Sequence, residues 1–149
     1  MWIEFGRYYQ ALNPVQYRAP KEDGLVEWFR RQLDDAGDED QTWLVAEGPD
    51  GLVGSIQRQV WRPSDDADWQ LVREVGETLL KVNHVIVTEA ERRRGIARAL
   101  MEGIEVWGVS RGATQAVVVS TADSPTSVPF YEEGMGYWRK TIGFWKALG

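Results

Sequence analysis

Apolar residues near the start of the chain recur every three to four positions, the period of an amphipathic helix. This pattern predicts one helix over residues 2–12 and a second over residues 25–33. Asn13-Pro14 ends the first helix because the residue before a proline avoids the helical region, and Asp23 can cap the second. The apolar positions are Trp2, Phe5, Tyr9 and Leu12 in the first helix and Leu25, Trp28, Phe29 and Leu33 in the second.

Strand-like segments follow in the middle of the chain. Thr42–Glu47 and Leu52–Trp61 flank Gly48-Pro49-Asp50-Gly51, whose residue types form tight turns, so the two segments are expected to pair as a hairpin. Residues 62–77 are polar and are expected to form a loop with a short helical piece. Leu79–Val87 is rich in β-branched residues, which predicts a third strand.

Helices and strands alternate in the second half. A helix-period segment runs to about Ser110, and residues 116–120 form a continuous apolar run that predicts a buried strand. Since a helix joins it to strand 79–87, the two strands are expected to be parallel neighbours. A short helix capped by Ser127 and a last strand over Trp138–Leu148 complete the chain. This order indicates a mixed α/β fold of the α+β type.

The composition excludes several classes of function. The 149 residues suit one domain, and the net charge of −6 argues against nucleic acid while being compatible with a cationic small substrate. The absence of cysteine excludes a thiolate nucleophile and a Cys-based metal site, the single histidine excludes a His-rich one, and no metal is expected. No apolar run approaches a membrane span and the N-terminus has no signal-peptide core, so no membrane partner and a cytoplasmic location are expected.

The richest local signal lies between strand 79–87 and the helix that follows it. The apolar run Val85-Ile86-Val87 leads into a basic turn and a glycine, and a helix begins at once. The first turn of a helix has free backbone N–H groups and the positive end of the dipole, and a glycine there lets an anion approach closely. An anion of the phosphate type is therefore predicted to bind at Arg92, Arg93, Arg94, Gly95, Ile96, Ala97 and Arg98.

Three stretches resemble the GNAT superfamily of N-acetyltransferases. Arg92–Ala97 is similar to the R/Q-x-x-G-x-G/A pyrophosphate loop, Phe130–Tyr137 to the late FYEKLGF segment, and Leu12-Asn13-Pro14 to the opening of some bacterial members. The resemblance implies one GNAT-like domain over residues 1–149, with a central mixed, mostly antiparallel, splayed sheet flanked by helices. Members usually begin with a strand, whereas this chain starts on a helix, so an edge strand is expected to be missing or supplied by a partner chain.

The resemblance also implies a binding mode for acetyl-CoA. Backbone N–H groups of residues 92–98 would bind its pyrophosphate, and Val85, Ile86 and Val87 would offer backbone groups to the pantetheine arm where the strand splays from its neighbour. Ser124 stands where the family often has an asparagine. Tyr131 would be the general acid that reprotonates the CoA thiolate, the alternative being a half-buried tyrosine bonded to a backbone group.

The sequence does not decide which residue acts as the general base. His84 has an ordinary pKa near neutral pH and lies on the central strand, but it could equally pack on the other face of the sheet. Asn83 cannot take a proton, and an acidic residue of the 62–77 loop could act instead.

The expected activity is acetyl transfer from acetyl-CoA to a primary amine. A cationic small molecule such as an aminoglycoside or polyamine is the first candidate acceptor, since the acidic clusters 34–40 and 65–68 could attract it; otherwise they are solvated loops. A protein N-terminus or lysine is the second candidate, and a non-catalytic CoA-binding module the competing class. A homodimer is a further expectation because of the incomplete sheet edge. The candidate acceptor residues are Trp61, Asp65, Asp66, Asp68 and Trp69.

Overall fold

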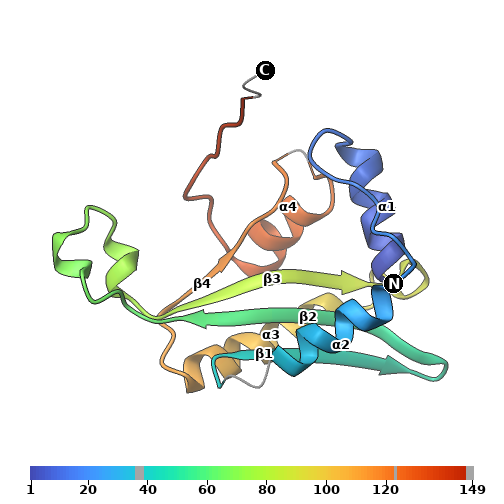
Figure 1. Cartoon of the computed structure of the whole chain (residues 1–149), viewed down its shortest axis with the longest axis horizontal. Coiled ribbons are helices and arrows are strands. Elements are labelled where there is room, and N and C mark those ends of the chain that lie inside the picture. Colours follow the sequence, from blue (N-terminus) through green and yellow to red (C-terminus); the bar gives the residue numbers. More distant parts are fainter. Residues whose placement is uncertain (36–38, 123, 147–149) are drawn as a thin grey trace. The chain divides into compact units, whose positions relative to one another are not determined.

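A computed structural model of the chain describes residues 1–35, 39–122 and 124–146. Its contacts divide it into two compact units, Met1–Val119 and Ser120–Gly149, each described by itself. The expectation of one domain stays a prediction. The first unit contains α1 (Trp2–Leu12), α2 (Leu25–Asp35), β1 (Gln41–Gly48), β2 (Gly51–Trp61), β3 (Leu79–Val87), α3 (Ile96–Ser110) and β4 (Gln115–Val118), and the second contains α4 (Ser127–Pro129), which runs into a π-helical turn at Phe130–Gly134 (Figure 1).

The sheet has the strand order β1-β2-β3-β4. β1 and β3 are both antiparallel to β2, while β3 and β4 are parallel. This confirms the α+β class with a mixed, mostly antiparallel sheet, and it confirms the parallel pair joined by helix α3. As expected, the first element of the chain is a helix, and no strand precedes α1 in the described residues.

Helices cover both faces of the sheet (Figure 1). The Leu44 side chain faces α3, since a Cβ at Gly103 of that helix would lie 3.3 Å from Leu44 Cδ1. The next side chain along β1, Trp43, points to the opposite face and contacts Phe29 of α2. Helix α1 lies on this second face too, because Trp2 packs against His84 of β3.

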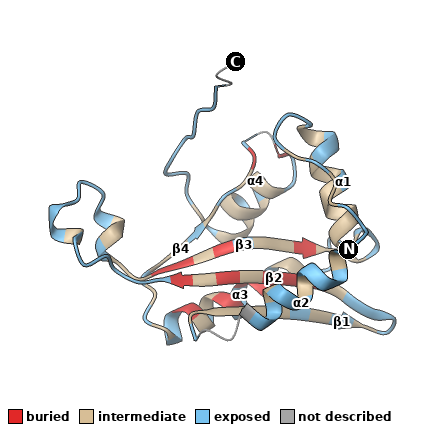
Figure 2. Cartoon of the chain, in the orientation of Figure 1, coloured by how far each residue is buried: buried red, intermediate tan, exposed pale blue. Residues whose placement is uncertain are grey.

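The buried apolar core lies along β2, β3 and α3 (Figure 2). Packing beneath α3 is close: a Cβ added at Gly108 would lie 2.9 Å from Leu80 Cδ2, so only glycine fits there without a shift. The opposite face is covered instead by aromatic rings from α1, α2 and β1, which pack in tilted and edge-to-face arrangements. The buried apolar side chains are Ile56, Val60, Leu79, Leu80, Val82, Ile86, Leu100, Met101 and Ile104.

β3 separates from β4 halfway along its length. Leu79–Val82 pair with Gln115–Val118, whereas residues 83–87 pair only with β2. At the same point the register against β2 shifts, because Gln57 faces His84 and Arg58 faces Val82, which leaves Asn83 in a bulge. The expected splay of this strand is confirmed.

Two expected strands differ from the structure. The last strand is wrong over residues 138–146, which have no regular secondary structure, and its remaining residues, 147–148, lie outside the described chain. A strand forms only with a partner, and none pairs with this segment in the part of the chain described. The strand predicted at 116–120 exists as β4 but is not buried, because β4 is an edge: Val117 is 36% and Val119 80% exposed.

Two smaller observations complete the fold. Ser127 is the first residue of α4 and not its cap. The backbone N–H of Ser127 donates a hydrogen bond to Ser124 Oγ at 3.1 Å. Among the described residues, no helix is both long and apolar enough to cross a membrane.

Candidate functional site

The turn between β3 and α3 has the backbone geometry of an anion site. Gly95 precedes the first residue of α3 with φ 82°, and Arg93 also has a positive φ of 65°. Left-handed residues in a turn direct backbone N–H groups toward one side, where an anion can accept from them. A Cβ built at Gly95 would meet no described atom within 4 Å, so the space above the turn is open. These features fit a pyrophosphate group.

Arg92, Arg93 and Arg94 are all exposed, and Arg92 and Arg94 also make ion pairs. The guanidinium of Arg92 donates to Glu4 Oε1 at 3.2 Å and to the Val87 carbonyl at 3.2 Å. Glu4 also accepts from the backbone N–H of Glu89 at 2.7 Å, so this one carboxylate joins α1 to the basic turn. Arg92 therefore positions the turn against α1, and Arg94 Nη1 donates to Glu91 Oε2 at 2.7 Å.

The half of β3 that lacks β4 has backbone groups without a strand partner on that side in the described chain. In an antiparallel ladder, alternate N–H and C=O groups point to the partner strand and the others point away from it. Across residues 83–87 the groups that point away from β2 have no strand partner in the described chain. Ile86 is buried, so the side chains of Val85–Val87 serve mainly the core and the backbone is what a ligand could use.

His84 lies in the aromatic face of the sheet. Its ring centroid is 5.0 Å from that of Trp2 and 5.0 Å from that of Trp43. Burial lowers the pKa of His84 to about 4, so the ring is neutral at pH 7. Its Nε2 is buried and has no hydrogen-bond partner among the described residues. This geometry favours the packing alternative, and the role of general base stays a prediction.

The second unit holds the other two candidate residues. The backbone N–H of Ser124 donates to Thr121 O at 3.0 Å and its Oγ accepts from Ser127, so its side chain already orders the start of α4. Tyr131 lies in the π-helical turn, with its ring 5.2 Å from Phe130 and 5.9 Å from Tyr137. Single π-helical turns occur often at functional sites. The cofactor and acid roles of these residues stay predictions.

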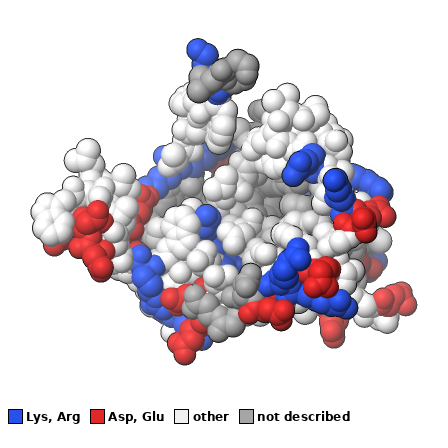
Figure 3. All heavy atoms as spheres, viewed as in Figure 1, with Lys and Arg blue, Asp and Glu red and all other residues white. Residues whose placement is uncertain are grey.

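Of the candidate acceptor residues, Trp61 ends β2 opposite Leu79, and the other four lie on the 62–77 loop that leads into β3. The basic turn follows the other end of that nine-residue strand, which spans about 26 Å. Figure 3 shows the acidic side chains of this loop grouped at one edge of the molecule. Asp66 accepts from Ser64 and Gln70, which lowers its pKa, and Lys81 Nζ lies 4.1 Å from the Trp61 ring. The structure therefore does not bring Trp61, Asp65, Asp66, Asp68 and Trp69 together with the basic turn.

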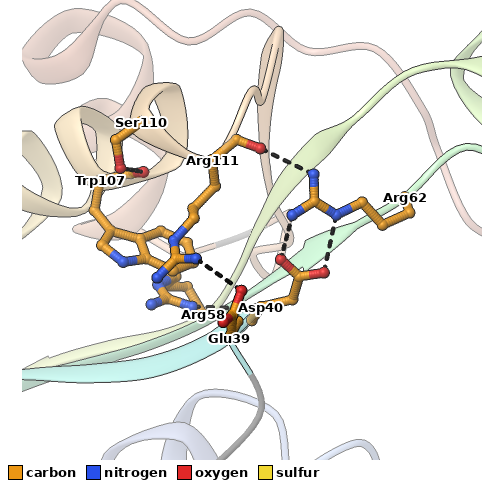
Figure 4. Close-up of polar contacts among 7 residues, drawn as sticks. All are labelled: Glu39, Asp40, Arg58, Arg62, Trp107, Ser110 and Arg111. Carbon is orange, nitrogen blue, oxygen red and sulfur yellow. Dashed lines mark hydrogen bonds and ion pairs between the residues drawn. The ribbon is translucent and has the colours of Figure 1, made fainter.

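One ion-pair network was not predicted (Figure 4). Arg58 of β2 is 1% exposed and stacks on Trp107 of α3, and its Nη1 donates to the Asp40 carbonyl at 3.2 Å. Burial, together with the nearby charge of Arg111, lowers the pKa of Arg58 to about 9. The signal in the sequence was a charged residue at a core-facing position between Ile56 and Val60.

The same network includes part of the acidic cluster formed by residues 34–40. The Asp40 carboxylate receives Arg62 Nε at 2.9 Å, and Arg62 Nη1 donates to the Arg111 carbonyl at 3.0 Å. Glu39 pairs with Arg111 at 3.5 Å. These two acidic residues serve the fold, while residues 36–38 of the cluster lie outside the described chain.

Solved structures with the same fold include acetyltransferases. A putative acetyl transferase from Pyrococcus furiosus is 21% identical with a TM-score of 0.64, covering 99% of this chain and 94% of its own. An aminoglycoside 6'-N-acetyltransferase from Acinetobacter haemolyticus is 15% identical with a TM-score of 0.62, covering 87% and 86%. An aminoglycoside N-acetyltransferase in complex with CoA is also 15% identical with a TM-score of 0.60, covering 86% and 96%. No curated protein sequence matches the chain.

The chain shares with these structures a mixed sheet whose strands β3 and β4 separate beside the N-terminus of α3. The chain belongs to the acetyltransferase (GNAT) family, whose family model matches residues 7–137. This confirms the resemblance drawn from the sequence motifs.

Proposed function

We propose that the protein transfers an acetyl group from acetyl-CoA to a primary amine. The observation that carries the proposal is the change in β3 after Val82, where β4 leaves the strand, followed by the turn with left-handed Arg93 and Gly95. An unpaired strand edge suits the amides of a pantetheine arm, since an extended ligand can pair with it as an added strand does. The helix N-terminus that follows suits a pyrophosphate.

The chain's own groups would hold and polarise the acyl donor. Acetyl-CoA supplies an activated thioester. A backbone N–H of residues 85–87 would donate to the thioester carbonyl and stabilise the charge that develops there. Because the chain has no cysteine, the amine would attack directly, without an acyl-cysteine intermediate.

Proton transfer would involve two side chains. Tyr131, in its π-helical turn, is the proposed general acid for the departing thiolate. His84 is neutral at pH 7 and could accept a hydrogen bond from the amine, but with a pKa of about 4 it is a weak base. An acidic residue of the 62–77 loop is the alternative base.

A cationic small molecule such as an aminoglycoside or polyamine is the proposed acceptor. The net charge of −6 supports it, as do the two aminoglycoside N-acetyltransferases among the similar structures. A protein N-terminus or lysine remains the second acceptor class. The low pKa of His84 and the exposed amide of Asn83 favour one further candidate, a CoA-binding module without turnover.

The test is a thiol-release assay with a panel of amines, combined with calorimetric titration of acetyl-CoA. We expect acetyl-CoA to bind and thiol release to depend on at least one cationic amine. Tyr131→Phe should lower turnover much more than acetyl-CoA affinity, and unchanged turnover would reject its role. Binding without release for any amine would favour the non-catalytic module, and no binding would reject both.

A further inference from the structure

Glu4 connects α1 to the segment between β3 and α3, residues 88–95, through one oxygen atom. Helix α1 starts beside the end of β3 (Figure 1). Glu4 Oε1 accepts the backbone N–H of Glu89 at 2.7 Å and the Arg92 guanidinium at 3.2 Å. Glu89 begins a 3-10 turn, and the residue before it, Thr88, makes no side-chain cap hydrogen bond within the described chain. Glu4 therefore satisfies a helix-start N–H that lies 85 positions further along the sequence.

Arg92 extends this contact to the last residue of β3. Its Nε donates to the Val87 carbonyl at 3.2 Å, while its Nη2 donates to Glu4. A guanidinium presents its donors in a rigid fork, so one side chain fixes the Glu4 carboxylate relative to the Val87 carbonyl. Tyr8 follows Glu4 by one helical turn on the same face of α1, and its ring centroid lies 5.7 Å from Arg92 Cζ. Arg92 is thus held between α1 and β3.

The position of Glu4 is itself fixed, because the aromatic side chains beside it hold α1 on the sheet. The ring centroid of Trp2 lies 5.0 Å from that of His84 on β3 and 5.3 Å from that of Phe29 on α2. Phe5, the residue after Glu4, has its ring centroid 6.0 Å from that of Trp2. Aromatic contacts of this kind add to the burial of apolar area. Glu4 therefore stands on a firmly packed helix.

We propose that Glu4 is a positioning residue for acetyl-CoA: it orders residues 88–95, so that the backbone N–H groups of the turn are already aimed at the pyrophosphate. The inference rests on the proposed function, because it takes acetyl-CoA binding at this turn as given. A preorganised site avoids the free-energy cost of ordering the segment when the ligand binds. By linkage, acetyl-CoA must in turn stabilise the packing of α1 against the segment.

The charge of Glu4 allows a clear test, because electrostatic repulsion alone predicts the opposite effect. A carboxylate near an anion site repels the ligand, so a Glu4 that acted only through its charge would weaken acetyl-CoA binding. Its removal would then strengthen binding. If Glu4 positions the segment, its removal weakens binding although a repulsive charge has gone. The direction of the change in affinity therefore separates the two roles.

The first test is calorimetric titration of acetyl-CoA into the wild-type chain, Glu4→Gln and Glu4→Ala. Glutamine keeps an oxygen for the Glu89 N–H but loses the charge that pairs with Arg92, whereas alanine loses both contacts. We expect affinity to fall about threefold in Glu4→Gln and about tenfold in Glu4→Ala, because charge-assisted hydrogen bonds are the stronger ones. The losses should persist at about 1 M salt, where the field of an exposed charge is screened within about 3 Å.

The matched control is Glu22→Gln. Glu22 Oε1 also accepts from an arginine of α1, Arg7 Nη2, at 3.1 Å. Both side chains of this pair are mostly exposed, and no hydrogen bond joins them to residues 88–95 in the described chain. Exposed pairs contribute little, so the affinity for acetyl-CoA should stay within about twofold of the wild type.

The second test is a double-mutant cycle between Glu4 and Arg92. Arg92→Gln is measured alone and together with Glu4→Gln. We expect the double variant to bind acetyl-CoA about as tightly as the weaker single variant, because either change already breaks the same contact. Additive losses would show that Arg92 acts on the ligand independently of Glu4.

The third test is hydrogen exchange of α1, which gives a readout other than affinity. Each protein is measured without acetyl-CoA and with a saturating concentration of it. We expect acetyl-CoA to slow exchange of the backbone amides of residues 5–12 by at least about threefold in the wild type and to leave it unchanged in Glu4→Ala. A residue that contributed only to stability would leave the slowing by the ligand intact. If Glu4→Ala does not fold, Glu4→Gln takes its place, with a smaller slowing than in the wild type as the expected result.

Several outcomes would overturn the proposal. These are unchanged or tighter binding in Glu4→Gln, an equal loss in Glu22→Gln, additive losses in the cycle with Arg92, and the same slowing of exchange in the Glu4 variant as in the wild type. A wild-type chain that does not bind acetyl-CoA would reject the proposed function together with this inference. Binding by the wild type therefore distinguishes the two failures.

Discussion

The two halves of β3 have different surroundings. Leu79–Val82 pair with strands on both sides, and Leu79, Leu80 and Val82 are buried in the core. Residues 83–87 begin with a bulge and an exposed Asn83, pair on one side only, and lead into the basic turn. A strand that is paired on both sides cannot accept a ligand by backbone pairing. The comparison indicates that the first half of β3 stabilises the fold and the second half is available for binding.

The largest expected effect concerns the first half. Leu80→Ala should lower the free energy of unfolding by about 3 kcal/mol, because it leaves a cavity under α3. Acetyl-CoA affinity of the folded protein should stay within about twofold, since Leu80 lies away from the proposed site. Urea denaturation and calorimetric titration measure the two quantities. Leu71→Ala, at a fully exposed position, is the control and should change stability by less than about 0.5 kcal/mol.

A large loss of acetyl-CoA affinity in Leu80→Ala would contradict the division of β3 into a structural and a binding half.

His84 gives the next effect, through pH. Its pKa is lowered to about 4 in the folded chain from an ordinary 6.5, so the unfolded chain binds more protons between these values. Stability contributed by the neutral ring is therefore complete above about pH 6.5 and is lost as pH falls toward 4. At pH 5 the loss should be about 2 kcal/mol.

Urea denaturation at pH 7 and pH 5 measures this loss, and His84→Gln is the comparison because it cannot be protonated. The difference in stability between the two pH values should shrink in the variant. The same low pKa predicts that His84 gives no acidic limb near pH 6.5 in the rate profile. Equal pH dependence of unfolding in both proteins would show that burial does not lower the pKa of His84.

Local patterns predicted the elements that depend on nearby residues. Helical spacing located α1 at residues 2–12 and β-branched residues located β3 at 79–87, both as found. The turn before α3 was predictable because Gly95 and the helix start are adjacent in sequence. The last strand was not, because it requires a partner that the pattern of residues 138–148 does not describe.

Features that depend on residues distant in sequence could not be predicted from local patterns. The bulge at Asn83 decides which face His84 occupies, and it becomes visible only in the register against β2. Arg92 contacts Glu4, 88 positions earlier, so its positioning role has no local signal. The burial of Arg58 under Trp107 likewise depends on how β2 packs against α3.

The smallest expected effect concerns the basic turn that follows residues 83–87 of β3. Gly95 and Gly112 lie at opposite ends of α3 with nearly equal φ values of 82° and 83°, and neither has a neighbour within 4 Å of a built Cβ. Gly95→Ala and Gly112→Ala should each cost about 1 kcal/mol of stability, because alanine is strained in the left-handed region. Only Gly95→Ala should weaken acetyl-CoA binding, by about tenfold or 1.4 kcal/mol, since only that residue adjoins the backbone N–H groups proposed to hold the pyrophosphate. Calorimetric titration of both variants separates the two costs, and equal affinities would place the pyrophosphate away from this turn.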